Sequence, residues 1–123
     1  MARWIAAPAG STVSPNDDGI EGFVVLGLRF QRIDKTTWFG ECLELGTATN
    51  ARTLNRTHDE LVELVILHLN ALEEAGERER FFSARNIVFH SPGQHLATVN
   101  MEVPVANDDV FFHPQTVPLA RVA

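Results

Sequence analysis

The sequence predicts an α+β fold, an antiparallel sheet of three to five strands with one long helix packed on it, in the order β-β-β-α-β. Two patterns predict this fold. Apolar residues alternate along short segments between residues 23 and 53, and they recur at helical spacing over residues 54–75. The chain of 123 residues has room for one compact domain with tails, because a second core normally needs on the order of another hundred residues.

Three strands are expected before the helix. In residues 23–33 the larger apolar side chains alternate and share one face of the first strand: Val24, Leu26, Leu28 and Phe30. Asp34 and Lys35 predict a hairpin turn into a second strand over residues 36–45, which Gly46 ends or interrupts with a bulge. Residues 47–53 contain several residues that strands tolerate well and predict a shorter third strand.

The helix over residues 54–75 is the strongest local signal, and Gly76 follows it where a left-handed cap is expected. Its start is open between Thr53 as the cap and a capping box formed by Thr57 and Glu60. The apolar arc combines a stripe with a second flank: Leu61, Leu64, Val65, His68 and Leu72, then Val62, Ile66 and Leu69. This arc is wider than one sheet needs, so a partner, a second copy or the C-terminal segment covers the surplus.

The chain divides into three parts. Residues 1–21 are rich in turn-forming residues and are expected to be a flexible leader. Residues 22–90 form the α+β domain, with a short helix or turn over 77–82 and a fourth strand over 87–89. Residues 91–123 form a C-terminal extension with one strand over 97–105, followed by an extended tail that carries Pro114 and Pro118. The core is expected to contain Trp38, Phe39, Phe81, Phe82 and the helix over residues 61–72.

Charge and cysteine content exclude several classes of protein. The 16 acidic and 10 basic residues give a net charge of -6 and a pI near 5.2, so direct DNA binding is not expected. The single cysteine, Cys42, cannot form an internal disulfide, and no apolar run reaches the roughly 20 residues of a membrane span. We therefore expect a cytoplasmic protein that does not bind a membrane.

The sequence predicts no catalytic, metal-binding or cofactor-binding residue. His58 and His68 are not spaced to bind one metal ion, and no serine lies in a strand-turn-helix elbow. The glycines form no phosphate-binding loop, and the one lysine, Lys35, lies in a predicted turn. The enzymatic alternative is a metal-dependent hydrolase that uses His90, His95 and a carboxylate.

Residues 28–90 resemble the HicB-like antitoxin domain family, in a stand-alone branch of it. The resemblance lies in WFGECLELG at 38–46, ARTL at 51–54 and LNALEEAGERERFF at 69–82. It implies an incomplete RNase H-like fold without nuclease carboxylates and association into dimers or higher oligomers. It also implies a small basic ribonuclease toxin as the partner. The DNA-binding module usual in that family is not expected here, since residues 91–123 have no helical periodicity.

The resemblance, together with the lack of catalytic motifs, implies a non-enzymatic, HicB-like interaction protein without cofactors that acts as the antitoxin of a type II toxin-antitoxin pair. The alternative is a stand-alone homo-oligomer with no toxin, whose subunits are held together by the C-terminal segment. The residues predicted for a partner or oligomer interface come from the helix flank and the C-terminal extension: Val62, Ile66, Leu69, Val99, Met101 and Val103.

Overall fold

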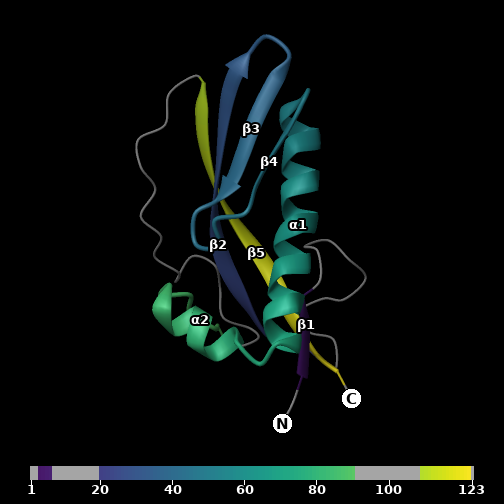
Figure 1. Cartoon of the computed structure of the whole chain (residues 1–123), viewed down its shortest axis with the longest axis vertical. Coiled ribbons are helices and arrows are strands. Elements are labelled where there is room, and N and C mark those ends of the chain that lie inside the picture. The colour runs from purple at the N-terminus through teal and green to yellow at the C-terminus, as the bar shows by residue number, and fades with distance from the viewer. Residues whose placement is uncertain (1–2, 7–19, 91–108, 123) are drawn as a thin grey trace.

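The fold is an antiparallel sheet of five strands with a long helix packed on one face, which confirms the α+β class. The computed structural model describes residues 3–6, 20–90 and 109–122. The strands are β1 (Arg3–Ala6), β2 (Ile20–Asp34), β3 (Thr37–Cys42), β4 (Ala48–Ala51) and β5 (Val110–Val122), in the spatial order β1-β5-β2-β3-β4. The helices are α1 (Leu54–Glu74) and α2 (Arg78–Ala84) (Figure 1).

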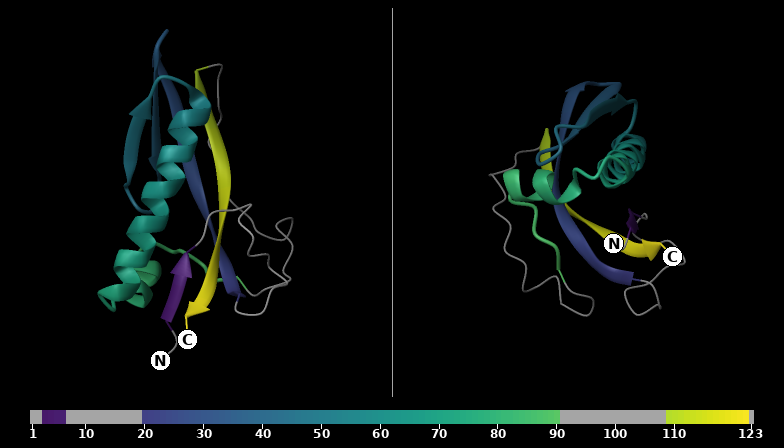
Figure 2. Two further views of the ribbon diagram at one scale, coloured as in Figure 1. Left: turned by 90° about the vertical axis from the view of Figure 1, so that its right-hand side faces the viewer. Right: turned by 60° about the horizontal axis from the view of Figure 1, so that its bottom comes forward.

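The sheet is strongly curved, and α1 lies in its hollow (Figure 2). The alternation predicted for the first strand is confirmed, since Val24, Leu26 and Leu28 of β2 have no exposed surface. They pack against the buried side of α1, where Leu61 and Val65 are 0% and 1% exposed. Burial of apolar surface between the sheet and α1 therefore stabilises the fold. No helix in the described residues is long and apolar enough to span a membrane.

The ends of α1 follow from local chemistry. Thr53 is the N-cap, with an extended backbone and a side-chain oxygen that accepts a hydrogen bond from the Arg56 N–H. The alternative capping box is wrong because the Thr57 hydroxyl is buried and donates to the Thr53 carbonyl oxygen, 2.8 Å away. After the helix, Gly76 has a φ of 71°, as predicted for a left-handed cap.

A glycine in β3 allows α1 to approach the sheet closely. A Cβ atom added at Gly40 would lie 2.9 Å from Cγ2 of Thr57 and 3.0 Å from the ring of Phe30. Trp38 lies on the same face of β3 and packs against the core. Phe39 is on the opposite face and is absent from this core cluster, so its assignment to the core was wrong.

The N-terminal region differs from the expected leader. Arg3–Ala6 form β1 and pair with the end of β5, from Arg3 opposite Val122 to Ala6 opposite Leu119. The prediction was wrong for these residues because pairing with a distant strand orders a segment that lacks a strong local signal. The second strand of the chain begins at Ile20, and residues 7–19 lie outside the described part of the chain.

The fourth strand predicted over residues 87–89 is absent. The Ile87 N–H donates to the Phe82 carbonyl oxygen, which keeps this residue at the end of α2. Only His90 pairs with the sheet, through a single bridge to Phe23. The other predicted strand, over residues 97–105, lies outside the described residues.

The extended tail expected at the C-terminus instead contains β5, the long strand between β1 and β2. The carbonyl oxygen of Asp109 accepts a hydrogen bond from the Arg32 N–H, so the backbone groups of Asp109 are directed toward β2. Backbone groups alternate along a strand, and Pro114 and Pro118 are an odd number of residues away. Their missing N–H groups therefore fall on the side away from β2, where a proline is tolerated.

Candidate partner-binding groove

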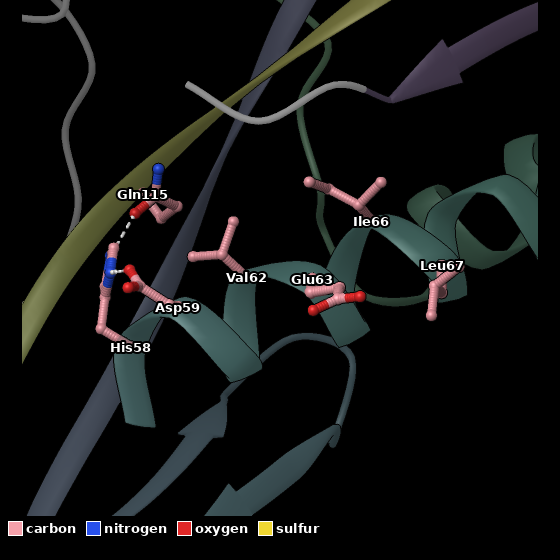
Figure 3. A pocket seen from close by; sticks show the side chains of 7 residues that line it. All are labelled: His58, Asp59, Val62, Glu63, Ile66, Leu67 and Gln115. Atoms are coloured by element: carbon pink, nitrogen blue, oxygen red, sulfur yellow. Dashed lines mark hydrogen bonds and ion pairs between the residues drawn. The ribbon is translucent and has the colours of Figure 1, made fainter. Parts of the chain in front are cut away.

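A groove of about 430 Å³ lies where α1 passes over β5. Its lining residues come from one flank of α1 and one position of β5: His58, Asp59, Val62, Glu63, Ile66, Leu67 and Gln115 (Figure 3). Beside this part of β5 the sheet has no further described strand, since β1 pairs only with residues 119–122. The groove is therefore bounded by the helix on one side and by a strand edge on the other.

The polar end of the groove is held by hydrogen bonds. Gln115 is 7% exposed, and its side-chain N–H donates to the Thr116 carbonyl oxygen. The Gln115 Oε1 atom then accepts from Nε2–H of His58, 2.9 Å away. Nδ1 of His58 lies 3.3 Å from a carboxylate oxygen of Asp59. These contacts fix the imidazole, whose edge also meets the ring of His113.

The rest of the groove is apolar with an acidic border. Val62 and Ile66 form its buried and half-buried surface, and Leu67 is 58% exposed at the outer side. Asp59 and Glu63 are exposed on the same flank of the helix (Figure 3). Apolar side chains bordered by carboxylates suit an apolar anchor flanked by basic groups, because a ligand site combines apolar burial with a few placed charges.

The strand edge beside the groove is closed to an added strand. Outside the part paired with β1, the groups of β5 that face away from β2 belong to residues 110, 112, 114, 116 and 118. Two of the residues beside the groove, Pro114 and Pro118, have no N–H. The Thr116 carbonyl oxygen is already bonded to Gln115. Prolines and occupied carbonyl groups prevent edge-to-edge pairing. The groove is therefore suited to inserted side chains and not to a pairing strand.

The residues predicted for the interface lie in different parts of the structure. Val62 and Ile66 line the groove. Leu69 does not, since it is 3% exposed and belongs to the hydrophobic core. The prediction was wrong for Leu69 because it did not include β1, which also packs against α1. Val99, Met101 and Val103 lie outside the described residues.

Three residues of the 38–46 motif, Glu41, Cys42 and Glu44, make structural contacts. The Glu44 carboxylate accepts a hydrogen bond from the Gly27 N–H, with N···O distances of 2.8 and 3.1 Å. This N–H of β2 thereby has a partner beyond the point where β3 ends. Glu41 forms an ion pair with Arg29 across the sheet, on the face opposite α1. Burial raises the pKa of the Cys42 thiol to about 11, aided by the negative charge of Glu44, so this thiol is not an activated nucleophile.

The other described histidines have structural partners. Nδ1 of His68 lies 2.9 Å from the Thr47 hydroxyl, and the ring of His90 stacks on Phe23. Across residues 3–6, 20–90 and 109–122, no three His, Cys, Asp or Glu side chains cluster closely enough to hold a metal ion. His95 lies outside these ranges. No pattern in the sequence places Gln115 and His113 beside His58, because only the pairing of β5 with β2 brings them there.

Comparison of the chain with protein-family models, with curated proteins and with solved structures found no match.

Proposed function

We propose that this chain is a non-enzymatic, HicB-like interaction protein, the antitoxin that binds and inhibits a small basic ribonuclease. The resemblance of residues 28–90 supports the family assignment, together with the order β2, β3, β4, α1. The proposal includes the cytoplasmic location expected for a chain with one unpaired cysteine. The observation that carries the binding function is the groove between α1 and β5.

The groove supplies two kinds of interaction with a basic protein. An apolar side chain of the partner inserts between Val62, Ile66 and Leu67, and burying a side chain of leucine size contributes about 1.5–3 kcal/mol. Lysine or arginine groups beside this anchor meet Asp59 and Glu63. Exposed ion pairs contribute only about 0.2–1 kcal/mol each, so the anchor dominates the affinity. The acidic border and the net charge of -6 mainly raise the rate of association with a basic partner.

Inhibition follows from occupancy of the partner's surface and needs no reaction at this chain. The partner must present its anchor beside basic groups, and basic groups are also what a ribonuclease uses to hold the RNA backbone. Acidic side chains that bind those groups compete with RNA phosphates. The proposal therefore predicts that the complex and RNA binding are mutually exclusive.

Affinity purification of the tagged chain from its own cells tests this function. We expect recovery of a small basic ribonuclease at near-equal stoichiometry. Leu67→Asp should reduce its recovery at least tenfold because it removes the apolar contact, and Glu63→Lys should reduce it by a smaller factor; both residues are exposed and line the groove. Glu79→Lys is the matched control, because it reverses an exposed charge on α2, away from the groove.

Two results would contradict the proposal. Recovery of the chain alone, in a defined multiple, would favour the stand-alone homo-oligomer. Equal recovery of the ribonuclease by the Leu67→Asp and wild-type chains would exclude the groove as the binding site.

A further inference from the structure

The outer edge of β4 has backbone groups without hydrogen-bond partners. β4 ends the sheet, and just before it the Thr47 carbonyl oxygen accepts from the Cys42 N–H, so the backbone groups of Thr47 are directed toward β3. By alternation along the strand, those of Ala48 and Asn50 are directed away from β3. Both residues are exposed, and within the described part of the chain nothing bonds to these outward groups. The edge can therefore accept an extended segment.

A cavity of about 460 Å³ lies at the end of this edge, where β4 leads into α1. It is lined by Asn50, Ala51, Arg52, Thr53, Arg56 and Glu60. Arg56 forms an ion pair with Glu60, so these two charges largely cancel. Arg52 is exposed and has no hydrogen bond or ion pair with any described residue. The cavity thus presents one cation that a carboxylate can reach.

An apolar side chain of α1, Leu64, borders the same edge. The Glu60 carboxylate accepts from the Thr49 hydroxyl, and His68 meets the Thr47 hydroxyl, so the flank of α1 between Glu60 and His68 faces the β4 side. Leu64 lies on this flank, four residues from each, and is 37% exposed. Figure 2 shows α1 and β4 adjacent in the end-on view. A strand added at β4 would therefore place side chains beside Leu64.

We propose that the edge of β4 binds an extended segment of another protein, in which an acidic side chain is followed two residues later by an apolar one. The segment pairs antiparallel with β4, and its backbone bonds to the outward N–H and C=O groups of Ala48 and Asn50. Because directly opposite residues share a face, the side chains opposite Ala51 and Thr49 are on the α1 side. The acidic one meets Arg52, and the apolar one covers Leu64.

The charge at this edge favours such a segment over two other occupants. A second copy of β4 supplies no carboxylate for Arg52, since Ala48–Ala51 contain no acidic residue. The basic partner proposed for the groove would meet Arg52 with a like charge. The β4 edge therefore selects a partner of different charge from the groove, and this inference does not depend on the proposed ribonuclease.

Fluorescence anisotropy with the purified full chain tests the surface. The labelled probe is the peptide Ser-Glu-Thr-Leu-Thr-Ser, and we expect its anisotropy to rise to saturation. Proline in place of the threonine between Glu and Leu removes the N–H that bonds to Asn50, and it should abolish binding. Glutamine in place of Glu should weaken binding about two- to fivefold, because one exposed ion pair is lost.

A charge exchange tests the contact with Arg52. Arg52→Glu should reverse the preference, so that a probe with lysine in place of Glu binds more tightly than the original probe. Arg80→Glu is the matched control, because Arg80 is exposed on α2, away from β4 (Figure 1), and the preference for the original probe should remain.

Variants of the edge itself complete the test. Asn50→Pro removes one outward N–H without touching the β3 side and should abolish binding, whereas Asn50→Thr keeps the N–H and should retain it. Far-UV circular dichroism checks that each variant is folded, and the proline-containing probe gives the same answer with the wild-type chain. Absence of saturable binding by the wild type, equal binding of the proline-containing probe, or an unreversed preference in Arg52→Glu would each overturn the proposal.

Discussion

The two flanks of α1 border sheet edges of opposite character. On one flank, part of β5 has no neighbouring strand, and Pro114, Pro118 and Gln115 protect this edge against pairing. Between this edge and α1 lies the groove lined by apolar and acidic side chains. On the other flank, β4 has an open edge beside Leu64. The difference separates two modes of association: side chains insert on the β5 flank, whereas backbone pairing is available on the β4 flank.

The largest expected effect comes from Leu61, which has no exposed surface and lies beneath both flanks. Leu61→Ala should lower the free energy of unfolding by about 2–5 kcal/mol, because it removes buried contacts and leaves a cavity. Urea denaturation measures this loss. Leu67→Ala is the control, since its side chain is 58% exposed and its loss should change stability by less than about 0.5 kcal/mol. Equal losses in the two variants would contradict the assignment of the core.

The next effect concerns the close approach of α1 to β3. Gly40→Ala should lower the free energy of unfolding by about 1–3 kcal/mol, because the added methyl group would lie 2.9 Å from Cγ2 of Thr57. Adding Thr57→Ser removes that methyl group and keeps the buried hydroxyl, so the double variant should recover part of the loss. An additive result in denaturation, with no recovery, would show that the two residues are not in contact.

A pH dependence is expected from Cys42. Its pKa is raised from 9.0 to about 11 in the fold, mainly by burial, so the folded chain keeps a proton that the unfolded chain has lost. The contribution to stability is complete below pH 9 and is lost as the pH rises from 9 through 11. The fall in unfolding free energy over this range should be smaller in Cys42→Ala. Parallel pH profiles of the two chains would contradict this reading.

The smallest expected effect tests edge protection directly. Pro114→Thr restores an N–H on the closed edge of β5, and Pro114 is exposed, so the fold should be retained. We expect a minor fraction of larger species in size-exclusion chromatography, formed by pairing at this edge. Combining Pro114→Thr with Asn50→Pro should leave such species in place. Their loss in the combined variant would mean that the β5 edge stays closed for another reason.

Elements with a strong local pattern were predictable from the sequence. The helix ending before Gly76, the hairpin at Asp34 and Lys35, and the alternation of the first strand need only neighbouring residues. The start of the helix at Thr53 was one of two choices, and the capping box of Thr57 and Glu60 was the stronger pattern. Burial of the Thr57 hydroxyl against β3 decided it for Thr53.

The strands β1 and β5 were not predictable because their stability comes from each other and from β2. Two prolines in β5 argue against a strand until its neighbours are known. For the groove, the wide apolar arc of α1 indicated Val62 and Ile66. Gln115 carries no signal in the sequence, and its place beside His58 depends on the register of β5.

The measurement that tests the central claim most directly is RNA cleavage by the recovered ribonuclease, titrated with this chain. We predict that cleavage falls to background near an equimolar ratio with the wild-type chain, and with Asn50→Pro, which leaves the groove intact. Leu67→Asp should restore cleavage at the same ratio. Unchanged cleavage in the presence of the wild-type chain would contradict the antitoxin function, and full inhibition by Leu67→Asp would contradict the groove as its site.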